Sequence, residues 1–197
     1  MIMYELRQHK TEIRTAYMEK RANMPAEERA AKNAAVCKSV LASATYRFAD
    51  TLLLYYPRAD EVDVLPIARA ALEAGKKVAF PKCHPADKSM DFHFVSSVDD
   101  FEKGEYDIME PVNSLGIYNK ENSLRDNCIC IVPAVVYDKK GYRIGYGGGY
   151  YDRYLSGFRG TVVGIAYRDF ILPNVPHGRF DVAVDVLISE GGIYAKS

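Results

Sequence analysis

The stretch Arg143-Ile-Gly-Tyr-Gly-Gly-Gly-Tyr-Tyr-Asp-Arg153 holds four glycines, three tyrosines, one aspartate and two arginines in eleven residues. Before it, the apolar run Ile129-Cys-Ile-Val-Pro-Ala-Val-Val136 predicts a buried strand, followed by the turn Asp138-Lys-Lys-Gly141. After it, Tyr150-Tyr-Asp-Arg-Tyr-Leu155 predicts the start of a helix. Glycine allows close backbone approach to a ligand, and a helix N-terminus offers unpaired N–H groups to an anion. The arrangement therefore predicts a phosphate-binding loop, with tyrosine faces on which a ring could stack.

This glycine loop (residues 145–149) matches neither of the two commonest nucleotide-binding patterns. No Lys-Ser or Lys-Thr follows the glycines, as a P-loop requires, and Tyr150 stands where a dinucleotide fingerprint has its third glycine. The alternative is a tight glycine turn between strand and helix that binds no ligand. The flanking arginines, the tyrosines and Asp152 favour the ligand-binding interpretation.

Composition limits the class of partner. The chain has 197 residues, 48% of them hydrophobic, so it can bury a full core as one domain over residues 1–197. Its 26 lysines and arginines equal its 26 aspartates and glutamates, which gives a formal net charge of zero. Nucleic-acid-binding proteins normally carry a basic excess, so we expect no nucleic-acid partner. A small anionic ligand, held by local positive groups, remains compatible with this balance.

The cysteines and the N-terminus bear on the compartment. Cys37, Cys83, Cys128 and Cys130 lack the paired Cys-x-x-Cys spacing of a zinc site, so we expect reduced thiols. The N-terminal sequence Met1-Ile-Met-Tyr-Glu-Leu-Arg7 is charged and helical, unlike a signal peptide. The sequence contains no apolar run near the roughly 20 residues that cross a bilayer. We therefore expect a cytoplasmic protein with no membrane partner.

The elements alternate after a pair of N-terminal helices. The first helix is predicted over residues 3–22, and the second begins near Pro25, which occupies its first turn. The pattern then predicts strands over 51–56, 77–80, 91–95, 129–136, 161–166 and 182–189, with a helix over 64–74. We expect Pro81 to end the second strand, and residues 97–127 give no clear prediction. The alternation favours a single three-layer α/β/α domain with a mainly parallel, Rossmann-like sheet. Ligands of such sheets bind beyond the carboxyl ends of the strands, where the glycine loop falls.

Three cations share one face of the first predicted helix. Arg7, Lys10 and Arg14 lie at positions i, i+3 and i+7, beside the apolar stripe of that helix. A solvated charge run is the alternative, but the position next to a packed face favours contact with phosphate.

Carboxylates near the glycine loop suggest a magnesium site. Asp152 lies just inside the helix after the loop, where an acid is stabilising in any case. Magnesium commonly takes one or two carboxylates together with nucleotide phosphates. Asp181 and Asp185 are the candidates for a second carboxylate, because a spacing of four places both on one side of the predicted last strand. Of these two we favour Asp185.

Glu61 follows the Tyr55-Tyr56-Pro57 end of the first predicted strand, so we expect it on a loop that faces the ligand. The alternative is an ordinary glutamate on a surface loop. The sequence contains no Gly-x-Ser-x-Gly elbow and no paired histidine spacing, so we assign no nucleophile and no catalytic histidine.

The stretch 143–153, preceded by Val132-Pro-Ala-Val-Val-Tyr-Asp138, closely resembles the signature of the 5-formyltetrahydrofolate cyclo-ligases, or methenyltetrahydrofolate synthetases. Lys10-Thr-Glu-Ile-Arg14 is similar to the family's N-terminal Lys-x-x-Leu-Arg element. Asp60-Glu61-Val62 resembles its substrate loop, and Val184-Asp-Val-Leu-Ile-Ser-Glu190 its C-terminal strand. The resemblance spans essentially the whole chain.

Two positions depart from the family pattern. Phe180 precedes Asp181 where the family often has histidine, and Ser189 stands where threonine is common. These departures concern only the detail of the C-terminal site.

The resemblance implies ATP- and Mg²⁺-dependent ring closure of 5-formyltetrahydrofolate to 5,10-methenyltetrahydrofolate by a monomer, with release of ADP and phosphate after phosphorylation of the formyl oxygen. It implies that Lys10 and Arg143 are catalytic and that Asp152 and Asp185 hold magnesium. The nucleotide-binding residues that it implies are Lys10, Arg14, Arg143, Gly145, Tyr146, Gly147, Gly148, Gly149, Tyr150 and Tyr151. The folate-binding residues that it implies are Tyr56, Glu61, Tyr146, Gly147, Gly148, Gly149 and Tyr150.

The residue types suit that chemistry, because phosphoryl transfer depends on positioning and charge neutralisation rather than on a protein nucleophile. Two other readings remain open. A sugar-phosphate isomerase or CoA-transferase relative would not need ATP, and a non-catalytic nucleotide- or folate-binding module would bind without turnover.

Overall fold

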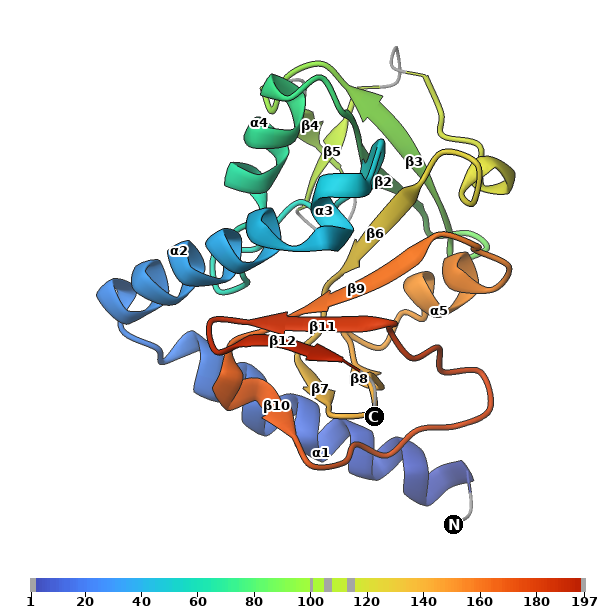
Figure 1. Ribbon diagram of the computed structural model, residues 1–197. Helices are drawn as coiled ribbons and strands as arrows, with labels where there is room; N and C mark the ends of the chain where they lie inside the picture. The colour runs from blue at the N-terminus through green and yellow to red at the C-terminus, as the bar shows by residue number, and fades with distance from the viewer. Residues whose placement is uncertain (1–2, 100, 105–107, 113–115, 196–197) are drawn as a thin grey trace.

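The computed structural model describes residues 3–99, 101–104, 108–112 and 116–195. Its centre is a seven-stranded sheet in the order β12-β11-β9-β6-β1-β2-β3 (Figure 1). The strands of this sheet are β1 (Thr51–Leu53), β2 (Lys77–His84), β3 (Ser89–Val95), β6 (Cys128–Val132), β9 (Thr161–Ile165), β11 (Val186–Ser189) and β12 (Gly192–Ala195). The five inner strands are parallel, and the edge strands β3 and β12 pair antiparallel with their neighbours. The predicted mainly parallel sheet is confirmed.

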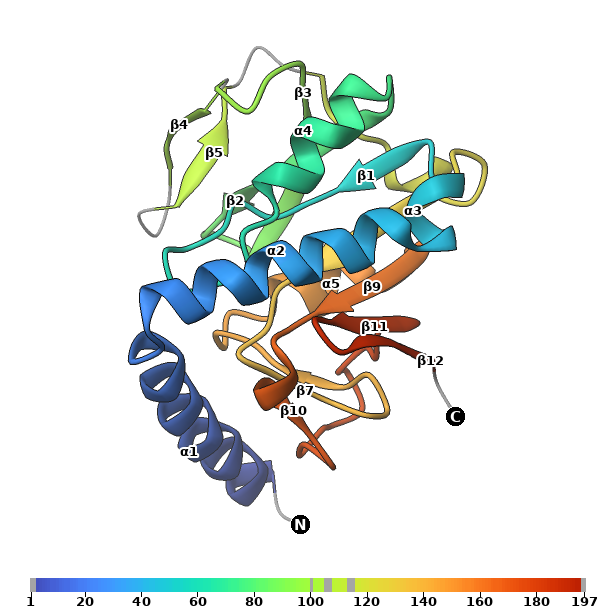
Figure 2. The same cartoon turned by 60° about the vertical axis from the view of Figure 1, so that its left-hand side comes forward.

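Helices cover both faces of the sheet. The helices are α1 (Met3–Ala22), α2 (Ala26–Ala42), α3 (Ala44–Phe48), α4 (Leu65–Glu73) and α5 (Tyr150–Leu155). In Figures 1 and 2, α2 and α4 lie on one face of the sheet and α5 lies on the other, which gives the predicted three layers. The N-terminal helix α1 lies outside these layers, beside a small second sheet. Among the described residues, no helix combines the length and apolar character needed to cross a membrane.

The small second sheet sits next to the glycine loop. It has the order β10-β7-β8, formed by β10 (Ile171–Leu172), β7 (Val136–Asp138) and β8 (Arg143–Ile144). A further antiparallel pair, β4 (Phe101–Lys103) with β5 (Met109–Pro111), and 3₁₀ turns at Lys120–Asn122 and Arg168–Phe170 complete the fold. The region 97–127, which gave no clear prediction, thus contains short strands and a turn; its residues 100, 105–107 and 113–115 lie outside the described residues.

The core follows from apolar runs that are covered on both faces. Every residue of β1 and β6 is buried, as expected for inner parallel strands whose side chains meet helices on both sides. The helix α4 buries Ile67, Ala68 and Ala71 against the sheet, and Gly75 ends it with a positive φ of 75°. Full burial of a single isoleucine such as Ile131 stabilises the fold by about 1.5–3 kcal/mol.

Two strand boundaries differ from the prediction because of proline. The predicted strand 129–136 splits: β6 ends at Val132, and after Pro133 and Ala134 the chain enters β7 in the second sheet. Pro81 does not end β2, which continues to His84. Strand β1 pairs with β2 only as far as Ala79, so Pro81 has a neighbouring strand, β3, on one side only. A missing N–H is tolerated on the other side, where no strand would accept its hydrogen bond.

The last predicted strand starts later than expected. Strand β11 begins at Val186, so Asp181 and Asp185 precede it instead of sharing one side of it. The reason is that Val184 donates its N–H to the carbonyl of Gly141, which draws this segment towards the turn between β7 and β8. The chain then adds the antiparallel edge strand β12, which the sequence analysis did not predict.

Replacing Ile131 in the central strand with alanine should lower the free energy of unfolding by about 2–5 kcal/mol, because Ile131 is 0% exposed and its removal leaves a cavity. The matched control is Ile193→Ala in the edge strand β12, where the side chain is 53% exposed and we expect a change within about 0.5 kcal/mol. Urea unfolding curves measure both, and equal losses would contradict this placement of the core.

Candidate active site

A cavity of about 800 Å³ lies beyond the carboxyl ends of β1 and β6. Helix α1 lines one side of it, the segment after β1 lines the floor, and the glycine loop between β8 and α5 lines the opposite side. This is the position at which ligands bind in open α/β sheets. The predicted site residues that line the cavity are Lys10, Arg14, Tyr56, Glu61, Arg143, Gly145, Tyr146, Gly147, Gly148, Gly149, Tyr150, Tyr151 and Asp152. Asp185 is not among the lining residues.

The glycine loop depends on backbone conformations that favour glycine. Gly147 has a φ of 97° and Gly149 has a φ of 73°, both in the left-handed region. Gly149 is also the N-cap residue of α5. A Cβ atom on Gly148 would lie 2.7 Å from the ring of Tyr150. The loop can therefore present its backbone to the cavity only because these positions carry no side chain.

Helix α1 supplies the cations that face the loop. Arg7, Lys10 and Arg14 all line the cavity, so the spacing i, i+3, i+7 places them on one face of the helix, towards the cavity. Arg14 Nε donates to the carbonyl of Gly145 at 2.7 Å, and Lys10 Nζ lies 2.5 Å from Asp181 Oδ2. The helix thus contacts the glycine loop and Asp181 through charged side chains.

An ion pair between a buried arginine and a half-buried aspartate anchors the start of α5. Arg143 Nη2 donates to Asp152 Oδ1 at 2.8 Å, and its Nη1 donates to the carbonyl of Val182 at 2.7 Å. The N–H of Val182 donates to the same Asp152 oxygen at 3.1 Å. Because the Arg143 side chain is only 5% exposed, these bonds compensate the loss of water around its charge.

Two of the three candidate magnesium-binding aspartates line the cavity, and the third does not. Asp152 and Asp181 line it, and in the described part of the chain Asp152 Oδ2 and Asp181 Oδ1 make no hydrogen bond. Asp185 lies outside the lining, with its Oδ2 accepting from the N–H of Val162 at 2.8 Å near the start of β9. The structure therefore brings Asp152 together with Asp181, and the predicted pairing with Asp185 stays a prediction.

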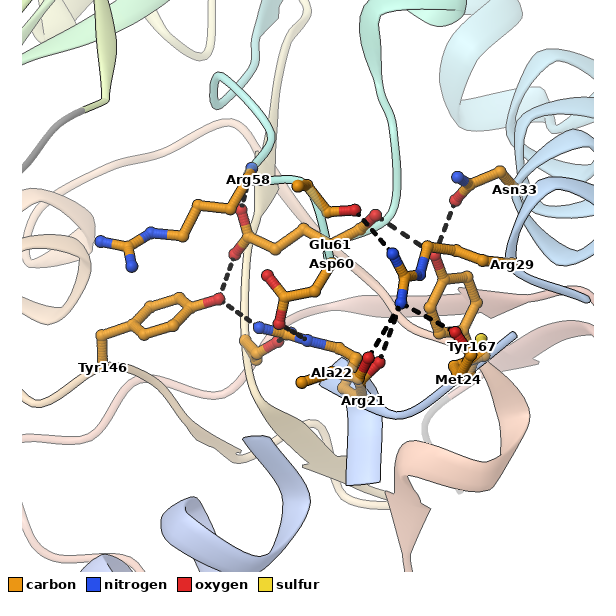
Figure 3. Close-up of polar contacts among 12 residues, drawn as sticks. Arg21, Ala22, Met24, Arg29, Asn33, Arg58, Asp60, Glu61, Tyr146 and Tyr167 are labelled. Atoms are coloured by element: carbon orange, nitrogen blue, oxygen red, sulfur yellow. Dashed lines mark hydrogen bonds and ion pairs between the residues drawn. The ribbon is translucent and has the colours of Figure 1, made fainter. Parts of the chain in front are cut away.

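Glu61 lines the cavity, and its polar contacts are drawn in Figure 3. The residue is 5% exposed, its Oε1 accepts from the Tyr146 hydroxyl at 2.6 Å, and its Oε2 accepts from the Arg58 N–H at 2.8 Å. Burial raises the pKa of Glu61, while the Arg58 and Tyr146 hydrogen bonds and the charge of Arg21 act in the lowering direction. A buried carboxylate at this point can accept hydrogen bonds from a planar ligand that carries N–H groups.

Sequence analysis missed two arginines of the site. Arg58 lines the cavity, and its guanidinium lies 4.8 Å from the centroid of the Tyr146 ring. Arg21 is 4% exposed, lies outside the cavity lining and donates to the Tyr146 hydroxyl. A signal for Arg21 was present, because Arg7, Arg14 and Arg21 recur every seven residues, a spacing that keeps one helix face with a drift of only about 20° per repeat.

The cysteines take no part in the polar groups of the site. Cys37, Cys128 and Cys130 are buried, and burial raises the pKa of the Cys128 thiol to about 12, so this thiol stays protonated and poorly nucleophilic at neutral pH. Cys83 lines the cavity, and its backbone N–H donates to Glu110 Oε1 at 3.0 Å.

The parallel sheet, the glycine loop beyond its carboxyl edge and the facing row of cations define an α/β enzyme for small anionic ligands. A sequence profile of the 5-formyltetrahydrofolate cyclo-ligase family matches residues 6–190. The chain belongs to this enzyme family.

Known proteins support this assignment along nearly the whole chain. The 5-formyltetrahydrofolate cyclo-ligase of Haemophilus influenzae is 29% identical over 187 residues, which cover 92% of this chain and 98% of that protein. The solved 5,10-methenyltetrahydrofolate synthetase of Aquifex aeolicus is 31% identical with a TM-score of 0.82, covering 94% of this chain and 92% of that one. The synthetase structure from Mycoplasma pneumoniae, at 22% identity and a TM-score of 0.73 over 92% of this chain and 98% of that one, shows the same fold.

Gly147→Ala should lower the free energy of unfolding by about 1–2 kcal/mol, because the added Cβ makes the left-handed backbone unfavourable. Gly145→Ala is the matched control in the same loop: a Cβ there meets nothing within 4 Å, and we expect a change within about 0.5 kcal/mol. Urea unfolding measures both. Equal effects at the two positions would show that the loop does not adopt this conformation.

Proposed function

We propose that the protein catalyses the ATP- and Mg²⁺-dependent cyclisation of 5-formyltetrahydrofolate to 5,10-methenyltetrahydrofolate, with release of ADP and phosphate. The observation that carries this proposal is a single cavity with two chemically different ends. One end has the cations of α1 and the glycines that follow Tyr146, and the other has the buried Glu61 with its partner Tyr146. The names of the relatives from Haemophilus and Aquifex agree with such a reaction.

The nucleotide is assigned to the end formed by α1 and the glycine loop. Lys10 and Arg14 supply positive charge to the phosphates, and residues 145–151 wrap the nucleotide. Lys10 is the residue proposed to neutralise charge on the transferred phosphoryl group. Arg143 adds charge beside it and holds Asp152 in place through the ion pair.

The folate is assigned to the floor. Its planar pterin suits the aromatic faces of Tyr56 and Tyr146, and its N–H groups suit the carboxylate oxygens of Glu61. Because the two ends share one cavity, the formyl group of the folate can lie next to the terminal phosphate of the nucleotide.

The residues then fit a two-step reaction. The formyl oxygen attacks the γ-phosphorus, and the bond from that phosphorus to ADP breaks. The folate N10 amine attacks the activated formyl carbon, the carbon–oxygen bond breaks, phosphate leaves and N10 loses its proton. Neither step needs a protein nucleophile, so positioning and charge neutralisation by Lys10 and Arg14 are sufficient roles for the protein.

The carboxylates fit a magnesium ion that is shared with phosphate. No group of three or more histidine, cysteine, aspartate or glutamate residues that could hold a metal occurs among the described residues. Asp152 and Asp181 both line the cavity, and among the described residues each has one carboxylate oxygen with no hydrogen bond, which suits an ion held by one or two carboxylates plus phosphate oxygens. Magnesium bound there supplies charge to offset the phosphate oxygens.

The reaction is tested by the absorbance of the methenyl-folate band after mixing protein with 5-formyltetrahydrofolate, ATP and Mg²⁺. We expect a rise that requires both ATP and Mg²⁺. An absent rise in protein that still binds ATP would reject the proposed reaction in favour of a non-catalytic binding module. An activity without ATP on a sugar phosphate or a CoA ester would favour the isomerase or transferase alternative.

The carboxylate assignment predicts different losses for three matched substitutions. Asp152→Asn should reduce Mg²⁺-dependent turnover by at least about 100-fold, the upper range for partners of metal ligands. Because Asp181 lines the cavity and Asp185 does not, Asp181→Asn should cost more than Asp185→Asn. The rate is measured against Mg²⁺ concentration, with unfolding curves as a control for stability. The opposite order for the last two variants would assign the second carboxylate to Asp185.

A further inference from the structure

Three arginines follow one side of α1 at a spacing of seven residues. Arg7 and Arg14 line the large cavity, and Arg21 lies in the last turn of the helix, behind the cavity floor. At 1.5 Å per residue, the row from Arg7 to Arg21 spans about 21 Å. Helix α1 therefore reaches from the end of the site with the phosphate-directed cations to the end with Glu61.

Arg21 has contacts that differ from those of a surface arginine. Its Nε donates to Asp60 Oδ2 at 2.8 Å, its Nη1 donates to the carbonyl of Ala134 at 3.0 Å, and its Nη2 donates to the Tyr146 hydroxyl at 2.5 Å. Only 5% of its side chain is exposed. One planar guanidinium thus joins the segment after β1, the segment after β6 and the glycine loop, which suits arginine and not lysine.

The hydrogen bonds at Tyr146 have a fixed direction (Figure 3). Since a guanidinium only donates, the Tyr146 hydroxyl accepts from Arg21, and its single proton is left for Glu61 Oε1 at 2.6 Å. Chains of this kind strengthen each member when they are buried. The Arg21 charge also acts on Glu61 in the direction that favours its ionised form.

A second arginine holds the end of α1 in place. Arg29 of α2 donates to the carbonyls of Arg21 and Met24, which close the C-terminal end of α1, and to the carbonyl of Ala59 beside Asp60. These bonds add to the one that the Met24 N–H donates to the Arg21 carbonyl at 3.2 Å, where the helix leaves carbonyls without helical partners. Arg21 is therefore held at its backbone as well as at its side chain, and its position relative to Glu61 is fixed.

We propose that Arg21 is a positioning residue for the substrate end of the site. It sets the orientation of Tyr146 and the charge of Glu61, and so controls affinity for a planar ligand that carries N–H groups, without touching substrate or nucleotide. The inference rests on the proposed function, because it takes the folate as the ligand of Glu61 and Tyr146.

The central test is Arg21→Met in the methenyl-folate absorbance assay. We expect the KM for 5-formyltetrahydrofolate to rise about tenfold or more, as when a charged hydrogen-bond network is broken, while the KM for ATP changes less than about twofold. Loss of the positive neighbour should raise the pKa of Glu61 further. The acid limb of kcat/KM for the folate, which follows loss of the carboxylate as the pH falls, should then move to higher pH.

Two companion variants separate positioning from a general role in stability. Arg21→Lys keeps the positive charge but not the guanidinium that joins three groups. The acid limb of the pH profile of kcat/KM should therefore return towards that of the wild type, while the folate KM stays raised. In the Tyr146→Phe variant, Arg21→Met should raise the folate KM far less than it does in the wild-type protein, because the two residues act in one hydrogen-bonded network. If Arg21→Met does not fold, Arg21→Lys carries the test.

Lys32→Met is the matched control, since Lys32 also has three partners, the carboxylates of Glu28, Asp169 and Glu190, but lies outside the cavity lining. It should alter stability and leave the folate KM unchanged. An unchanged folate KM in the Arg21 variants, or equal rises for folate and ATP, rejects the positioning role alone. Absence of ATP-dependent methenyl formation in the wild type rejects the proposed function and this inference together.

Discussion

The ion pair between the buried Arg143 and the half-buried Asp152 holds together three pieces of the candidate site. It joins β8, the start of α5 and the segment at Val182, three pieces that enclose the glycine loop. A buried charge is tolerated only when its hydrogen-bonding groups find partners, so the pair fixes the relative positions of all three pieces. With these ends fixed, the loop adopts left-handed conformations at Gly147 and Gly149, and the side chains of Arg14 and Arg153 donate to the carbonyls of Gly145 and Gly148.

Helix α1 completes the site from outside the three layers of the sheet. Its contacts join residues far apart in sequence: Arg14 with Gly145 across 131 positions, and Arg21 with Tyr146 across 125. Ordering such distant groups costs chain entropy, which the burial of the arginines and the packing of the helix offset. The protein therefore has a cavity to which α1 and the glycine loop, far apart in the sequence, both contribute lining residues.

Much of the fold could be predicted from the sequence. Continuous apolar runs predicted the inner strands, because a strand covered on both faces excludes water from every side chain. The helix over residues 3–22 and the end of α4 at Gly75 were also predictable, because helical periodicity and a glycine with positive φ depend only on local backbone geometry. Boundaries were less predictable. Whether Pro81 ends a strand depends on which of its sides has a neighbouring strand, and that is a property of the sheet order.

The sequence by itself determined the residue types of the site, the glycine loop and the shared face of Arg7, Lys10 and Arg14, because these follow from local spacing and from the chemistry of each side chain. Only the tertiary structure decided which distant groups meet. It placed Asp181 in the cavity wall and turned Arg21 towards Tyr146. Such pairings depend on how the helices and loops pack across the sheet, and no local spacing of residues encodes that packing.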